Sequence, residues 1–110
     1  DLYGLDDVVL CHDDSQDPLF VYANEAAQWL WERRWDQFIG WPSRLTAPPS
    51  EQASRAQALA GDGIVRGYSG IRVSATGKLF RIHDAIVWTV ADEHGRPCGQ
   101  AATFARTTTL

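Results

Sequence analysis

The sequence has 110 residues, a formal net charge of −4 and 45% hydrophobic residues. A chain of this length can bury roughly two-thirds of its unfolded surface, so we expect one domain over residues 1–110 with its own core. The mild negative charge and the scattered basic residues argue against a nucleic-acid-binding surface, which normally carries a basic patch. No stretch is apolar over the length of a membrane span and none resembles a secretion signal, so we expect no membrane segment.

The two cysteines, Cys11 and Cys98, lie far apart and in no metal-binding or redox pattern. A disulfide between them is not indicated, and we expect buried thiols in a reducing cytoplasm. The chain contains no Met, even at position 1, so we expect it to come from a longer or trimmed protein.

The first half of the chain predicts a hairpin followed by short helices. Apolar runs at residues 7–12 and 19–23 flank a turn rich in Asp, Ser and Pro. Asn24 then has the position of a helix N-cap, and a helix with an apolar stripe runs to about Arg34. A short helical turn over residues 35–40 and a tight connector follow. A further helix begins at Thr46 or Ser50 and ends at residues 61–63, with a buried face formed by Ala53, Ala56, Leu59 and Ala60.

The second half predicts three strands, at residues 64–75, 78–91 and 97–107, joined by turns at residues 76–77 and 92–96. Side chains alternate across a strand, so the longest strand has one face that we expect to pack on the core: Phe80, Ile82, Ile86, Trp88 and Val90. The opposite face carries Leu79, Arg81, His83, Ala85, Val87 and Thr89. Asp84 falls in register with the apolar face, so either a bulge shifts the register there or a carboxylate points into the core side.

This order of elements predicts an α+β fold, a five-stranded antiparallel sheet with short helices packed on one face. It resembles the PAS fold, most clearly at residues 20–27 (FVYANEAA) and 38–40 (FIG). Residues 17–45, 70–77, 80–82 and 99–104 are similar to the MEKHLA domain, a PAS-related family found in bacteria and in some plant transcription factors. The similarity covers residues 8–104 and is to the bacterial type, since the signature that names the plant members is absent.

The resemblance implies a sensory or dimerisation module that holds a small ligand between sheet and helices, with no catalytic residues to carry over. Flavin-binding light sensors of the LOV type have a cysteine on a helix, whereas Cys11 and Cys98 lie in the first and last predicted strands. We therefore expect no photoactive flavin, and the sequence identifies no other cofactor.

Strand parity and the helix stripe place a candidate ligand pocket between the helical layer and the sheet. Its predicted lining residues are Trp31, Trp35, Asp84, Trp88 and Gln100. The cluster of Trp29, Trp31, Trp35 and Trp41 is open to two interpretations, an aromatic wall around a flat ligand or large rings that fill the core. The histidines stand at no zinc spacing, so we expect no metal site, and His83 is expected on the outer sheet face.

Two other functions compete with ligand sensing. In the first, the half-apolar outer face with Leu79, Ala85 and Val87 pairs with a second copy, giving a ligand-free homodimerisation module. In the second, the chain is a small α+β enzyme of the NTF2-like kind with an acid/His pair. Such folds usually begin with helices, whereas this sequence begins with predicted strands.

Overall fold

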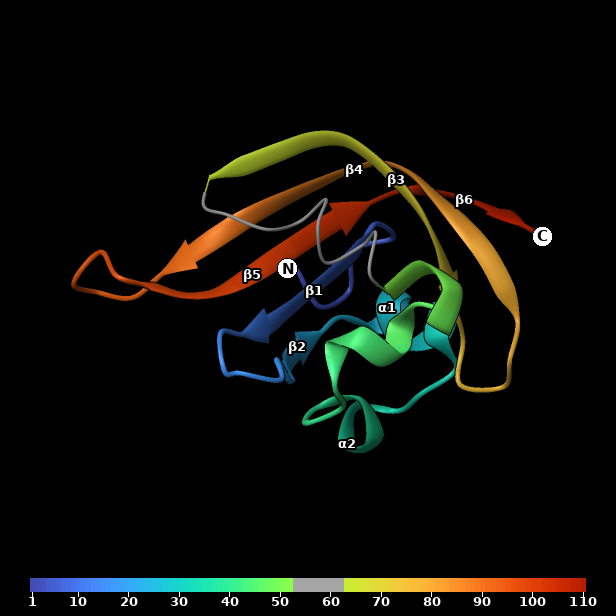
Figure 1. The fold of residues 1–110 in the computed structure, drawn as a ribbon, viewed down its shortest axis with the longest axis horizontal. Helices are drawn as coiled ribbons and strands as arrows, with labels where there is room; N and C mark the ends of the chain where they lie inside the picture. Colours follow the sequence, from blue (N-terminus) through green and yellow to red (C-terminus); the bar gives the residue numbers. More distant parts are fainter. Residues whose placement is uncertain (53–62) are drawn as a thin grey trace.

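The structure is a computed structural model, and it describes residues 1–52 and 63–110. Within these ranges a hairpin comes first, then short helices, then a run of long strands (Figure 1). The elements in chain order are β1 (Val8–Asp13), β2 (Phe20–Ala23), α1 (Glu25–Trp31), α2 (Trp35–Phe38), the 3₁₀ helix η1 (Ser43–Thr46), β3 (Ile64–Val73), β4 (Leu79–Ala91), β5 (Pro97–Phe104) and β6 (Arg106–Thr109).

The strands form one antiparallel sheet in the order β2-β1-β5-β4-β3, with β6 paired to the first half of β4. The sheet curves, and the helices lie together on its concave side, which we call the inner face (Figure 1). The predicted α+β class with an antiparallel sheet and helices on one face is confirmed. The last predicted strand, residues 97–107, is divided at Ala105 into β5 and β6, so the sheet has six strands rather than five.

Asn24 is the N-cap of α1, as predicted, and it does more than close the helix. Its side-chain oxygen accepts hydrogen bonds from the backbone N–H groups of Ala27 (3.1 Å) and Val9 (3.0 Å). Its side-chain amide donates to the carbonyl oxygens of Leu2 (3.1 Å) and Asp7 (2.8 Å). This buried side chain therefore joins the N-terminal segment, β1 and α1 at one point.

The helices differ from expectation mainly in length. The first ends at Trp31, three residues before the expected end at Arg34, because the next residue, Glu32, takes a left-handed conformation with φ of 60°. Residues 49–52 are helical, in agreement with a helix that starts near Ser50. The buried face predicted for that helix, formed by Ala53, Ala56, Leu59 and Ala60, lies outside the described residues, as does most of its predicted end.

A bulge at Asp84 changes which side chains of β4 face the helices. Asp84 has a φ of 53°, and the pairing with β3 steps from Ile82↔Gly70 to Ala85↔Tyr68, so β4 holds one residue more than its partner there. Phe80 and Ile82 are buried on the inner face before the bulge. After it the inner residues are Ala85 and Val87, both buried.

The predicted faces of the second half of β4 are therefore wrong. Ile86, Trp88 and Val90 alternate with the inner residues and lie on the outer face, half-buried. Of the two interpretations of Asp84, the bulge is correct. Its carboxylate is exposed and accepts a hydrogen bond from Arg106 Nη2 at 3.0 Å.

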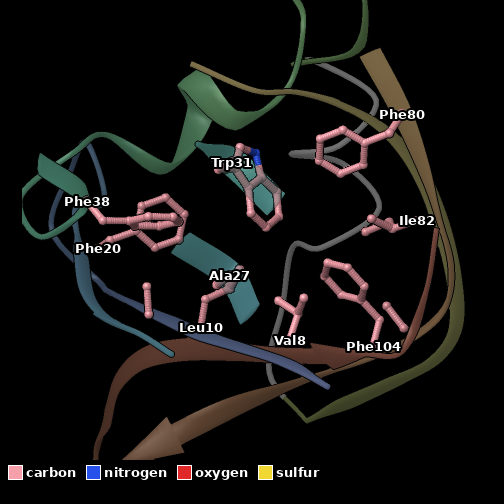
Figure 2. Packing of buried hydrophobic residues seen from close by; sticks show 11 residues of the cluster. Val8, Leu10, Phe20, Ala27, Trp31, Phe38, Phe80, Ile82 and Phe104 are labelled. Atoms are coloured by element: carbon pink, nitrogen blue, oxygen red, sulfur yellow. The ribbon is translucent and has the colours of Figure 1, made fainter. Parts of the chain in front are cut away.

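The core lies between the inner face and the helices, with Trp31 at its centre (Figure 2). The ring of Trp31 is 2% exposed and makes edge contacts with Phe38, Phe80 and Phe104 at centroid distances of 5.4–6.1 Å. Such pairs add to the stabilisation that burial of the rings provides. Cys11 is half-buried, while Cys98 is exposed rather than buried as expected, and neither forms a disulfide.

Candidate functional site

A cavity of about 40 Å³ lies between the inner face of the sheet and the helical layer. Apolar side chains from four strands form most of its wall, and Trp31 of α1 and Thr46 of η1 face them. The polar side chains among its lining residues are His12, Thr46, Tyr68, Arg72 and Gln100. A larger hollow of about 620 Å³ lies on the outer surface of α1, but its lining residues Trp29, Arg33, Arg34 and Lys78 include exposed charged chains in contact with solvent. We take the inner cavity as the candidate site because two of its polar side chains, Thr46 and Arg72, are buried, and the other three are half-buried.

The structure brings two of the five predicted site residues together. Trp31 and Gln100 both line the cavity. Trp35 begins α2 instead, where it is 41% exposed and packs against the rings of Tyr3 and Tyr22. The described lining of the cavity also does not include Asp84 or Trp88.

The bulge at Asp84 explains why those two residues are elsewhere. Asp84 itself occupies the bulge with its carboxylate exposed, and the change of parity puts Trp88 on the outer face. The four clustered tryptophans do not form a common wall either. Trp31 is in the core, Trp41 packs beside Phe20 and Phe38, and Trp29 is 83% exposed.

Arg72, which sequence reasoning did not select, is the charged group of the site. It lies on the inner face of β3 opposite Phe80 and is only 5% exposed. Its Nη2 donates to the Tyr68 hydroxyl at 2.9 Å, and its Nη1 donates to the Ile71 carbonyl oxygen at 2.9 Å. The guanidinium carbon is 5.4 Å from the centroid of the Tyr68 ring, within range of a cation–π contact.

Gly70 makes room for this arrangement. Tyr68, Gly70 and Arg72 are two residues apart and share the inner face. A Cβ at position 70 would stand 2.7 Å from the Tyr68 hydroxyl and 2.8 Å from Arg72 Nη1. The two side chains therefore lie across the glycine, close to the sheet. A glycine inside a strand often marks such a close approach, so Gly70 is the signal in the sequence that could have pointed to the site but was not used.

Two groups of the cavity can only donate hydrogen bonds, the Arg72 guanidinium and the Trp31 indole N–H, and they lie among side chains that can also accept. None of the ion pairs within residues 1–52 and 63–110 involves Arg72. The Nε1–H of Trp31 is a buried donor, and the described residues offer it no acceptor. His12 Nδ1 lies 2.6 Å from the Asp13 carbonyl oxygen, and because that oxygen can only accept, Nδ1 carries a hydrogen.

A polar clamp fixes the end of α1 that carries Trp31. Glu32 accepts hydrogen bonds from the hydroxyls of Thr76 and Ser74, and Lys78 Nζ is 3.5 Å from its other carboxylate oxygen. The Trp31 carbonyl accepts from the N–H of Ala75 at 2.9 Å. The hydroxyl of Thr76, followed by that of Ser74, lowers the pKa of the Glu32 carboxyl below its ordinary value of 4.5. The clamp thus anchors one wall of the cavity to the β3–β4 turn.

The other candidate functional residues from the sequence do not come together in a second site within the described residues. In the described part of the chain, His, Cys, Asp and Glu side chains form no group of three suited to a metal ion. His83 Nε2 is 2.7 Å from the Thr108 hydroxyl at the sheet edge. Among the described helices, none is long and apolar enough to cross a membrane.

Comparison with solved structures identifies the fold. A PAS domain from Colwellia psychrerythraea superposes with a TM-score of 0.81 and 14% identity, over 99% of this chain and 90% of that chain. An RNA-binding light-oxygen-voltage receptor gives a TM-score of 0.75 and 18% identity over 99% of this chain, which spans 30% of the receptor chain. A variant of the protein Vivid gives 0.71 and 15% identity, over 90% of this chain and 81% of that one.

These likenesses establish a fold of the PAS type. Comparison with curated protein sequences gives no match. The family model of the MEKHLA domain matches residues 1–109. Since this match extends over almost every residue, the chain belongs to the MEKHLA domain family, a family related to PAS domains.

Proposed function

We propose that residues 1–110 form one non-catalytic sensory module of the PAS type that holds a small molecule in the cavity of the inner face. The family and the fold both support a sensory PAS-type module. The observation that carries the ligand part is the cavity itself, where a buried guanidinium, a buried indole N–H and a few other polar side chains line a mostly apolar space. Pockets of this composition, apolar with a few fixed polar groups, are typical of small-molecule sites.

In this proposal the cavity residues have distinct roles. Trp31 forms the wall on the helix side, and Arg72 supplies the charge. Gln100, on β5, contributes an amide on the sheet side of the cavity, and its neighbours Gly99 and Ala101 are small and allow close packing. Trp35, Asp84 and Trp88 have no contact role in the cavity. We expect the module to act in the cytoplasm, in keeping with its two free thiols.

Native mass spectrometry of the freshly purified chain, with an absorption scan of the same sample, tests the proposal. The expected result is a non-covalent mass that is retained under gentle conditions and lost when the protein is unfolded by acid. The matched control is a variant that fills the cavity, Ala102→Phe, which should lose the added mass while keeping the far-UV circular dichroism spectrum. An added mass that survives in this variant would place the ligand elsewhere and contradict the proposal.

A second function is favoured by the outer face of the sheet. The bulge places Ile86, Trp88 and Val90 there, next to the neighbouring strand's Ile64, which is 60% exposed. A half-covered apolar surface of this kind suits pairing with a second copy of the chain. The sequence predicted Leu79, Ala85 and Val87 on this surface. Of these three residues, Leu79 is exposed, whereas Ala85 and Val87 are buried on the inner face.

Analytical ultracentrifugation over a range of protein concentrations tests the second function. Pairing through this face predicts a concentration-dependent dimer that Trp88→Ser abolishes and that the control Trp29→Ser, on the helical side, leaves unchanged. A wild-type chain that stays monomeric at high micromolar concentration would exclude homodimerisation.

A further inference from the structure

We propose that the ligand of the inner cavity is a short-chain monocarboxylate, whose carboxylate group is bound by Arg72. This inference rests on the proposed function and adds the chemical class of the ligand. It follows from three properties of the cavity, namely the charge of Arg72, the buried indole N–H of Trp31 that has no acceptor in the described residues, and the small apolar volume beside them.

The charge of Arg72 calls for an anion. A cation that is 95% removed from solvent is costly unless an opposite charge or several good acceptors compensate it. The two acceptors that Arg72 has in the described residues, the Ile71 carbonyl and the Tyr68 hydroxyl, are both neutral. They use two of the five N–H groups of a guanidinium, so three donors remain for a carboxylate, a group that binds guanidinium through charge-assisted hydrogen bonds.

The second buried donor supports the same ligand class. Trp31 lines this cavity, and its indole N–H has no acceptor within the described ranges. A buried N–H without a hydrogen-bond partner is unfavourable. A carboxylate that is bound to a guanidinium still has lone pairs that can accept a further hydrogen bond. A cationic ligand would be repelled by Arg72, and a purely apolar one would leave both donors unsatisfied.

The size and the wall of the cavity restrict the anion further. A single water needs roughly 10–15 Å³ of such space, so about 40 Å³ admits a molecule of only a few non-hydrogen atoms. Phe20, Ile82 and Val87 line the cavity, which provides an apolar contact for a methyl or ethyl group. Acetate and propionate combine a carboxylate with such a group, whereas chloride and nitrate do not.

NMR of the ¹⁵N-labelled chain gives a direct test, since each tryptophan contributes one indole N–H signal in an uncrowded region of the spectrum. The signal of Trp31 is assigned by its absence in Trp31→Phe. Sodium acetate is titrated at constant ionic strength against sodium chloride. We expect a saturable shift of the Trp31 signal with acetate or propionate, and none with chloride or with nitrate in place of acetate.

Two variants test whether the positive charge that binds the carboxylate belongs to Arg72. Arg72→Met replaces the guanidinium with an apolar chain, a change that buried sites often tolerate, and it should reduce the acetate affinity at least tenfold. Arg66→Met is the matched control, because Arg66 is exposed on the same strand, and it should bind acetate like the wild type. If Arg72→Met does not fold, Arg72→Lys is measured instead. It keeps the charge but loses the paired geometry, so it should bind acetate more weakly than the wild type.

The outcomes separate this inference from the function on which it rests. An acetate shift that persists unchanged in Arg72→Met would overturn the role of Arg72. A wild-type Trp31 signal that does not respond to any carboxylate would overturn the ligand class. If native mass spectrometry then still found a retained neutral or cationic molecule, the sensory proposal would stand without this inference; if it found none, both would fail.

Discussion

Replacing Asn24 with Ala should destabilise the fold far more than the loss of an ordinary helix cap. The side chain is fully buried and makes four hydrogen bonds, two as acceptor and two as donor. Alanine leaves the buried N–H groups of Val9 and Ala27 without an acceptor. Each unsatisfied buried group costs about 1–3 kcal/mol, while the carbonyls of Leu2 and Asp7 lie in partly buried positions that water can reach.

The expected loss is therefore about 2–6 kcal/mol in the free energy of unfolding, compared with about 1 kcal/mol for a typical N-cap. Asn24→Asp should also destabilise, because it keeps the acceptor but turns a carboxylate oxygen toward the carbonyls of Leu2 and Asp7. Urea unfolding followed by far-UV circular dichroism measures both variants, and an unchanged m-value would show that the compared states are the same.

The matched control is Gln37→Ala. Gln37 Oε1 accepts from the N–H of Arg34 at 3.2 Å on the exposed surface, where water can replace it, so this variant should lose less than about 1 kcal/mol. If Asn24→Ala costs no more than Gln37→Ala, burial of the cap does not matter and the reasoning from unsatisfied groups is wrong.

Three further predictions concern other parts of the molecule. Gly99→Ala should lower stability more than Gly70→Ala, because its new Cβ would strike the rigid His12 carbonyl rather than side-chain ends; equal urea midpoints would contradict this. Glu32→Gln should have a lower free energy of unfolding than the wild type at neutral pH. Because the folded-state pKa of Glu32 is lowered, this difference in stability should disappear as the pH falls below about 4.5 and through that pKa. A difference in stability that does not change with pH would refute this prediction. Trp88→Ser should leave the acetate response of the cavity intact, because Trp88 lies on the opposite face.

Local signals in the sequence were enough to predict most of the architecture. Asn24 before an apolar helical stripe gave the start of α1, and the glycine at position 77 gave the β3–β4 hairpin. These features depend on residues that are close in the sequence, so secondary-structure propensity and the alternation of apolar residues are sufficient to predict them. The family resemblance then agreed with the order of the elements.

The candidate site was predicted less well because it depends on a single backbone irregularity. Nothing in the residue types around Asp84 distinguishes a bulge from a carboxylate turned inward, since the sequence there has neither Gly nor Pro. Without the bulge, the alternation of faces is predicted incorrectly for every later residue of β4. For this reason Trp88 was predicted in the pocket. Arg72 was missed for a related reason: between Ile71 and Val73, an arginine reads as the solvent-facing residue of an alternating strand.

The bulge at Asp84 also has a consequence for how this fold diverges between relatives. Before the bulge the even-numbered residues of β4 face the helices, and after it the odd-numbered residues do so. Deletion of that single residue would exchange the two sets in the second half of the strand. Trp88 would then enter the cavity and Val87 would leave it. A one-residue gap at this position in an alignment of relatives therefore marks proteins in which the side chains after the gap have exchanged faces. The residues that line the cavity and those on the outer surface then differ, even where every neighbouring residue is identical.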